Sequence, residues 1–239
     1  MIPWQLIDTA IVPGGGELRL KRRGGEFSIM AGPIELMNSR LSGSEEALAR
    51  LACARLGGHG ASHILIGGLG MGFTLRAALA VLGADARVTV AELVPAVVAW
   101  ARGPMAEVFG TSLADPRVTV VEGDVGALIA AARGRYDAIL LDVDNGPDGL
   151  SRPANDSLYS LAGLAATRRA LRPDGTLAVW SSAPDERFTR RLGQADFAVD
   201  VERPHAGRGR GARHVIWLAR PRPTGRQGHR PAAPAARRS

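Results

Sequence analysis

The sequence predicts an α/β fold in which helices cover both faces of a mostly parallel β-sheet, preceded by a small N-terminal β unit. Three observations support this prediction. From His63 onward, short segments rich in β-branched and aliphatic residues alternate with helical segments. A glycine-rich stretch, GGLGMG, overlaps the end of the first of these predicted strands. The last two apolar segments are joined by a short polar link, which predicts an antiparallel pair at one edge.

The segment before His63 predicts the small β unit and one helix. ELRLKR (17–22) and EFSIM (26–30) alternate polar and apolar residues, and the glycines between them supply a hairpin turn. IELMNSR (34–40) predicts a third strand. A helix is expected over 44–56, with Ser44 as its N-cap and glutamates in its first turn. We therefore expect the β unit to occupy residues 1–43.

The pattern of residues 44–220 predicts a doubly wound, Rossmann-like domain. Its predicted strands are nearly all apolar, as strands buried on both faces should be. They span 63–68, 87–92, 117–124, 136–143 and 175–180, and the predicted helices between them span 74–82, 95–102, 125–133 and 156–171. The segments 196–202 and 212–219 form the antiparallel edge pair. A parallel sheet that ends in such a pair is the arrangement of class I methyltransferase-like folds.

The net charge of +7 comes from the C-terminal end of the chain. From Arg203 to Ser239 there are 10 arginines and no acidic residue, whereas the preceding residues carry 20 basic and 23 acidic side chains. A mildly acidic body does not favour nucleic-acid binding. Residues 221–239 have no apolar periodicity, so we expect a disordered basic tail, with a weak contact to nucleic acid or another acidic partner as the alternative.

The sequence has no feature of a membrane or secreted protein. Its apolar runs are far shorter than the roughly 20 residues that a membrane-spanning helix needs. The N-terminal residues have neither the basic nor the apolar region of a secretory signal. Cys53 is the only cysteine, which excludes an internal disulfide. We expect a cytoplasmic protein that does not bind a membrane.

The glycine-rich stretch lies where an α/β sheet brings the backbone closest to a ligand. Gly68, Gly70 and Gly72 have the spacing GxGxG, whereas the dinucleotide-binding motif requires GxGxxG and Phe73 occupies the place of its third glycine. No lysine follows, so the phosphate-loop motif is absent as well. Tight packing of a strand against a helix is the alternative reason for these glycines.

Carboxylates stand at three successive predicted strand ends. Glu92 ends the second strand of the parallel sheet, from where a carboxylate can accept hydrogen bonds from ribose hydroxyls. Asp124 ends the third, where it can accept from an adenine amino group or cap the next helix, and Asp142 ends the fourth. Clustered carboxylates repel phosphate but suit ribose, an amino group or a sulfonium. Together they predict a nucleoside ligand without a pyrophosphate.

The order and spacing of these segments resemble the spermidine synthase (polyamine aminopropyltransferase) family. The resemblance covers about residues 17–219 and rests on IGGLGMGFTLRAAL, AELVPAVVAWAR, DPRVTVVEGD, YDAILLDV, NDSLYS and LRPDGTLAVW. It implies a class I S-adenosylmethionine-dependent methyltransferase-like fold behind an N-terminal β domain, in a homo-oligomer. It also implies transfer of an aminopropyl group from decarboxylated S-adenosylmethionine to a small amine, without a metal.

The same resemblance assigns roles to individual positions. The positions that match the family's donor-binding residues are Gly68, Gly70, Met71, Gly72, Glu92 and Asp124. Asp142 matches the catalytic carboxylate, which orients the amine and removes a proton from it. Asp144 and Tyr159 match the region of the amine substrate. ELMNSRLSGSEE (35–46) resembles the segment over the entrance of the site, where Asn38, Ser39 and Glu46 are candidate lining residues.

Two positions depart from the family pattern. Met71 stands where the family's loop has an aspartate that helps to hold the aminopropyl ammonium, and a thioether cannot neutralise an ammonium. Asp144 follows Asp142 by two residues, whereas the family's second aspartate follows by three. Two alternatives to aminopropyl transfer stay open: a methyltransferase that uses intact S-adenosylmethionine, and a nucleoside-binding protein without turnover.

Overall fold

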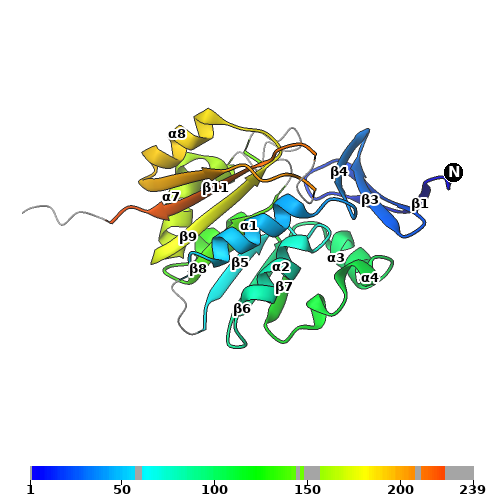
Figure 1. Ribbon diagram of the computed structural model, residues 1–239, viewed down its shortest axis with the longest axis horizontal. Coiled ribbons are helices and arrows are strands. Elements are labelled where there is room, and N and C mark those ends of the chain that lie inside the picture. The colour runs from blue at the N-terminus through cyan, green and yellow to red at the C-terminus, as the bar shows by residue number, and fades with distance from the viewer. Residues whose placement is uncertain (1, 57–60, 144–145, 148–156, 208–210, 224–239) are drawn as a thin grey trace, which may run out of the picture.

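The computed structural model describes residues 2–56, 61–143, 146–147, 157–207 and 211–223. Two β-sheets organise this part of the chain, and Figure 1 shows the smaller sheet beside one end of the larger one. Asp144 and most of the predicted basic tail, from residue 224 onward, lie outside the described residues.

The smaller sheet is antiparallel and contains the predicted β unit. Its strands follow chain order: β1 (Gln5–Ile11), β2 (Glu17–Arg23), β3 (Glu26–Ala31) and β4 (Ile34–Asn38). The three strands expected from the sequence are β2, β3 and β4. Strand β1 was not expected, because the irregular pairing between Leu6 and Asp8 breaks its alternation and most of its residues are exposed.

The larger sheet has seven strands in the order β10-β11-β9-β8-β5-β6-β7. They span β5 (His63–Gly67), β6 (Arg87–Glu92), β7 (Val118–Glu122), β8 (Tyr136–Leu141), β9 (Leu171–Ser181), β10 (Phe197–Glu202) and β11 (Val215–Pro221). Strands β5 to β9 pair in parallel, whereas β11 is antiparallel to both β9 and β10. The predicted fold class, including the antiparallel edge, is therefore confirmed.

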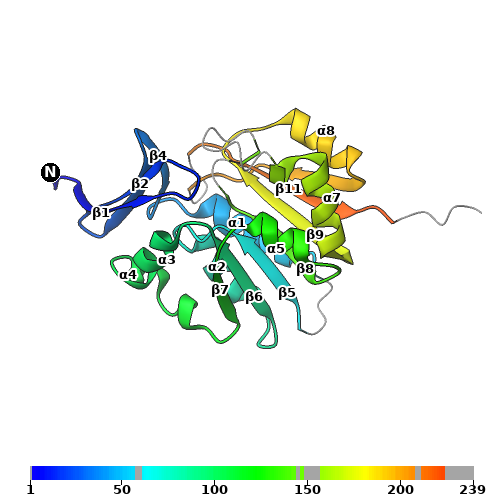
Figure 2. The ribbon, with the colours of Figure 1, turned by 180° about the vertical axis from the view of Figure 1, so that it is seen from behind.

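Helices cover both faces of the larger sheet. Figure 1 shows α1 (Gly43–Cys53) and α2 (Phe73–Val81) in front of it, and Figure 2 shows α5 (Val125–Ala131) and α7 (Leu161–Ala170) from the opposite side. One hydrophobic core joins α1, α2, α3 (Pro95–Arg102) and the smaller sheet, and a second core joins α5, α7 and α8 (Glu186–Gln194). After α3 come the short helix α4 (Ala106–Phe109) and a 3-10 turn at Ser112–Ala114.

Two features of the second core differ from the expectation. The sequence did not predict α8, because ERFTRRLGQ has few apolar residues; two of them, Phe188 and Leu192, lie one turn apart and are fully buried. The predicted helix over 156–171 is interrupted: residues 157–159 are helical, and α7 begins after Ser160, whose hydroxyl caps it by accepting from the Gly163 N–H at 3.1 Å.

Candidate active site

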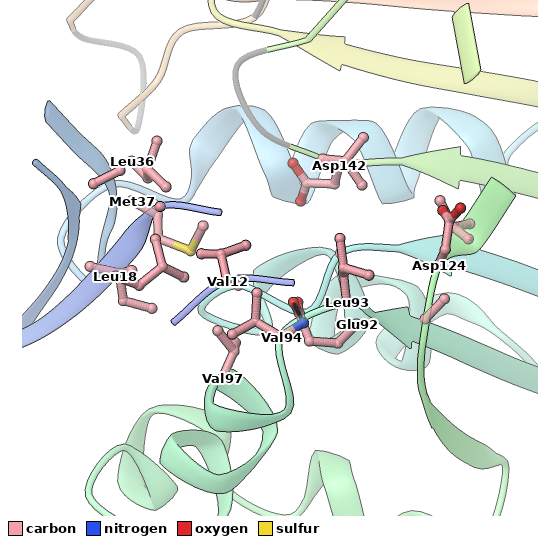
Figure 3. A pocket seen from close by; sticks show the side chains of 18 of the residues that line it. Val12, Leu18, Leu36, Met37, Glu92, Leu93, Val94, Val97, Asp124 and Asp142 are labelled. Carbon is pink, nitrogen blue, oxygen red and sulfur yellow. Dashed lines mark hydrogen bonds between the residues drawn. The ribbon is translucent and has the colours of Figure 1, made fainter. Parts of the chain in front are cut away.

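Five of the predicted site residues meet in one cavity between the carboxyl ends of the parallel strands and the smaller sheet (Figure 3). Its free space is about 940 Å³, part of which opens to solvent. The predicted residues that line it are Gly68, Gly70, Glu92, Asp124 and Asp142. In open α/β sheets, ligands bind at this edge, beyond the carboxyl ends of the strands.

The glycines of the loop after β5 allow close approach of other parts of the chain. Gly68 has φ of +90°, and a Cβ there would collide with the main-chain carbonyl of Asp142. A Cβ on Gly70, at φ of +51°, would lie 3.0 Å from the Met37 sulfur of β4. The loop therefore touches both the end of β8 and the smaller sheet, and a residue with a side chain at Gly68 or Gly70 would prevent this close approach.

Met71 and Gly72 lie behind the cavity and not in its wall. The Met71 side chain is 3% exposed and belongs to the first hydrophobic core. Gly72 precedes α2 with φ of +73°, and a Cβ there would collide with the Phe109 ring. Both residues have structural roles in the loop. The donor contact implied by the family match stays a prediction for them.

Glu92 is almost fully buried at the end of β6. Its two carboxylate oxygens accept hydrogen bonds from the Leu69 and Val94 N–H groups, each at 2.9 Å. These bonds tie the glycine loop to the chain that enters α3. Contact of Glu92 with a ribose stays a prediction.

Asp124 combines a cavity position with a capping role. One of its carboxylate oxygens accepts from the Gly126 N–H at 2.8 Å, which makes it the N-cap of α5. The capping alternative raised by the sequence is thus confirmed. Asp124 is also exposed and lines the cavity, so contact with an adenine amino group stays a prediction.

The carboxyl group of Asp142 occupies a poorly hydrated position beside the cavity. The Thr74 hydroxyl of α2 donates to its Oδ2 at 2.6 Å. Loss of hydration is the main cause that raises the pKa of Asp142 to about 7; the nearby Glu45 carboxylate raises it further, and the Thr74 bond opposes both. Part of the residue still lines the cavity, so this carboxyl can accept a proton from a ligand near neutral pH.

Glu45, on the first turn of α1, is a functional candidate that sequence reasoning missed. The Ser44 hydroxyl lies 2.5 Å from Glu45 Oε2 and 2.9 Å from Nδ1 of His214, whose pKa is lowered by burial. Burial also raises the pKa of Glu45. A glutamate in the first turn of a helix is expected to complement the helix dipole, so its position next to Asp142 left no separate signal in the sequence.

The other predicted residues lie away from the cavity. Tyr159 is buried in the second core, edge-on to the Phe188 ring at 5.5 Å between centroids. Asn38 and Ser39 accept main-chain hydrogen bonds in the turn after β4. Glu46 pairs with Arg50 at 3.1 Å on the surface of α1. A substrate contact of Tyr159 or of Asp144, which lies outside the described residues, stays a prediction.

Solved structures with this fold include spermidine synthases. Spermidine synthase from Thermotoga maritima superposes with a TM-score of 0.73 at 17% identity, over 90% of this chain and 72% of that one. A probable spermidine synthase from Corynebacterium glutamicum gives 0.59 at 16% identity, over 90% and 80%. Human methyltransferase-like protein 13, in complex with SAH, gives 0.55 at 21% identity, over 76% and 81%. At these identities the likeness establishes the fold.

Curated relatives at higher identity are polyamine aminopropyltransferases. Polyamine aminopropyltransferase 1 of Streptomyces coelicolor is 38% identical over 125 residues, which is 52% of this chain and 23% of that protein. The Mycobacterium tuberculosis enzyme is 35% identical over 128 residues, 52% of this chain and 24% of its own length. The match thus spans about a quarter of the length of these relatives. No protein-family model matches the sequence.

The fold and the cavity define a Rossmann-like protein of the class I methyltransferase type, with the N-terminal antiparallel sheet of a spermidine synthase. The resemblance of this chain to the spermidine synthase (polyamine aminopropyltransferase) family is confirmed. None of the helices in the described ranges is both long and apolar enough to cross a bilayer.

Proposed function

We propose that this protein is a spermidine synthase-like transferase that moves an aminopropyl group from decarboxylated S-adenosylmethionine to an amine acceptor. The observation that carries the proposal is the position of Asp142, a carboxyl group with a pKa of about 7 beside a cavity that Glu92 and Asp124 also line. The sequence similarity to polyamine aminopropyltransferases supports the same assignment.

The cavity suits a nucleoside donor that has no phosphate. In the proposed complex the ribose hydroxyls donate to Glu92, the adenine amino group donates to Asp124, and the sulfonium lies near Asp142. Among the lining residues that the structure describes, the charged side chains are carboxylates, which favour a cationic donor over a phosphorylated one. The glycine loop at 68–70 lets the backbone approach the nucleoside closely.

The transfer itself is a single displacement. The lone pair of a neutral amine attacks the aminopropyl carbon next to sulfur, the new N–C bond forms, and the C–S bond breaks with its electron pair going to sulfur. An amine with a pKa near 10.4 is almost wholly protonated at neutral pH, so Asp142 orients the acceptor and accepts one proton from it before the attack. Methylthioadenosine leaves as a neutral product, and the new secondary amine keeps its remaining proton as an ammonium.

The placement of Met71 favours a second candidate, methyl transfer from intact S-adenosylmethionine. Met71 occupies the position of the family's ammonium-binding aspartate, and it is buried in the core. An amino acid group on the donor would meet no carboxylate from this loop, so intact S-adenosylmethionine would not be repelled there. Asp142 would have the same role, because methyl transfer to an amine also releases a proton.

Calorimetric titration with decarboxylated and intact S-adenosylmethionine, side by side, tests the proposal. We expect tighter binding of the decarboxylated form, followed by formation of methylthioadenosine when an amine is added. Preference for the intact form, with S-adenosylhomocysteine as product, would establish methyl transfer. Binding of either nucleoside without any product would identify a non-catalytic homologue. We propose a cytoplasmic location on the basis of the sequence.

A further inference from the structure

We propose that the acceptor is an amine with an uncharged, apolar chain, and that the N-terminal sheet forms the surface that recognises this chain. This inference rests on the proposed function, because it takes Asp142 as the group that meets the amine nitrogen. It goes beyond that function in naming the class of acceptor.

The cavity has two chemically different sides. Figure 3 shows Asp124 and Asp142 on one side and Leu18, Leu36, Met37 and Val97 on the other, with Glu92 and Val94 next to each other between them. The apolar lining residues that come from the N-terminal part of the chain and the start of α3 are Val12, Leu18, Ile29, Leu36, Met37, Val94 and Val97. An acceptor whose nitrogen lies at Asp142 can therefore extend its chain along an apolar wall.

A second ammonium on the acceptor would find little to pair with on the apolar side. Within the described part of the chain, Glu17 is the one acidic residue that the smaller sheet contributes to the lining. Its side chain is 51% exposed and lies 3.8 Å from the Arg19 guanidinium. Among the described residues, the remaining wall offers no charged partner to a buried cation, which would lose its hydration there, and this opposes binding.

The apolar wall is fixed in place on both sides. The Trp100 indole N–H of α3 donates to the Asp8 carboxylate of β1 at 2.6 Å. On the other side, Met37 of β4 packs against Gly70 in the glycine loop after β5. Leu18 and Ile29 belong to the same hydrophobic core as Val94 and Val97. The apolar wall is thus held in place by the fold and is continuous with the part of the cavity that holds the carboxylates.

The test compares amines of equal length on the full chain saturated with methylthioadenosine. We expect calorimetry to give at least tenfold tighter binding for n-pentylamine than for 1,5-diaminopentane. From butylamine to hexylamine, affinity should rise roughly fourfold for each added methylene, because each is buried on the apolar wall. Equal or tighter binding of the diamine would overturn the inference, as would the absence of binding by any of these amines.

A matched pair of variants on β4 tests whether this strand contacts the chain of the acceptor. Leu36→Glu puts a carboxylate into the wall, and we expect it to reverse the preference toward the diamine. Ile34→Glu makes the same change on the same strand at an exposed position outside the cavity and should leave the preference unchanged. If Leu36→Glu does not fold, Leu36→Ala should weaken pentylamine binding, and unchanged affinity would contradict the inference.

The transfer reaction is measured separately. Selective binding of alkylamines without any transfer product would support the apolar acceptor surface and refute the proposed activity. Transfer to diamines in preference to alkylamines would support the activity and refute the acceptor class. The two proposals therefore fail independently.

Discussion

Asp142 is the residue on which the proposed chemistry depends. It lies at the end of β8, its carboxyl accepts from Thr74, and its pKa is raised to about 7. Neither feature needs a bound ligand, so the strand end is already prepared to accept a proton. A carboxyl at its ordinary pKa would be a much weaker base for an amine proton.

The substitution Asp142→Asn should abolish proton acceptance while keeping the shape of the cavity. We expect turnover to fall by at least about 100-fold, with affinity for methylthioadenosine changed less than about threefold. Steady-state kinetics and calorimetry measure the two effects. Asp137→Asn, at the opposite end of the same strand, is the control and should retain turnover. Full activity of Asp142→Asn would remove Asp142 from the mechanism.

Glu92→Ala should weaken nucleoside binding by about 1–3 kcal/mol, because ribose hydrogen bonds and the main-chain bonds that hold the loop are lost together. Calorimetric titration with methylthioadenosine measures the loss. Glu122, which stands beside Glu92 in the neighbouring strand β7 and is exposed, provides the matched control Glu122→Ala. Equal affinities of wild type and Glu92→Ala would show that the nucleoside lies elsewhere.

Replacing Glu45 by Gln tests the charge that acts on Asp142. The negative charge of Glu45 raises the pKa of Asp142, so Glu45→Gln should lower that pKa. Asp142 accepts a proton in its ionised form, and the acidic limb of the kcat/KM profile should therefore move to lower pH. The charge of Glu46 acts on Glu45 and not directly on Asp142, so Glu46→Gln, at the adjacent position on α1, should move this limb much less. An unmoved limb in Glu45→Gln would mean that its charge does not act on Asp142.

At the scale of elements, the junction between the glycine loop and α2 depends on Gly72. Its φ of +73° is unfavourable for residues with a side chain, and a Cβ would collide with the Phe109 ring. Helix α2 carries Thr74, so a shift of its first turn would also disturb the bond to Asp142.

Gly72→Ala should destabilise the protein by about 1–3 kcal/mol through backbone strain and the clash with Phe109. Thermal or urea unfolding measures this change. Gly83→Ala, just past the end of the same helix, has open space around the added methyl group and should change stability much less. Equal stabilities of the two variants would mean that the loop can rearrange around Gly72.

At the scale of the whole molecule, the carboxyl groups of Asp142 and Glu45 make the free energy of unfolding depend on pH. The pKa of Asp142 is about 7 in the folded protein and near 3.8 in the unfolded chain, and that of Glu45 is raised as well. The folded state therefore binds more protons than the unfolded state between these values. Its stability falls as pH rises from about 4 through about 7.

As pH rises from 5 to 8, the melting temperature of wild type should fall relative to that of Asp142→Asn. The reason is that asparagine cannot ionise, so the variant avoids the cost of a poorly hydrated charge. Each unit of separation between the folded and unfolded pKa corresponds to about 1.4 kcal/mol. Melting curves at several pH values measure this, and parallel curves for the two proteins would contradict a raised pKa of Asp142.

The fold could be predicted because its elements carry their own signals in the sequence. Parallel strands buried on both faces are continuous apolar runs, and the short link after residue 202 permits only an antiparallel return. Strand β1 and helix α8 were not predicted, because their sequences lack a clear pattern of apolar residues. The pairing of β1 is irregular, and α8 buries Phe188 and Leu192 among charged residues.

By itself, the sequence determined the α/β architecture and the convergence of Gly68, Glu92, Asp124 and Asp142 at one edge of the sheet, because parallel strands bring their carboxyl ends together. Only the tertiary structure decided what surrounds that edge. Glu45 and Thr74 approach Asp142 from helices 68 residues and more away along the chain, Met71 is buried, and the smaller sheet adds an apolar wall. Such contacts depend on how helices and sheets pack, and local periodicity does not encode them.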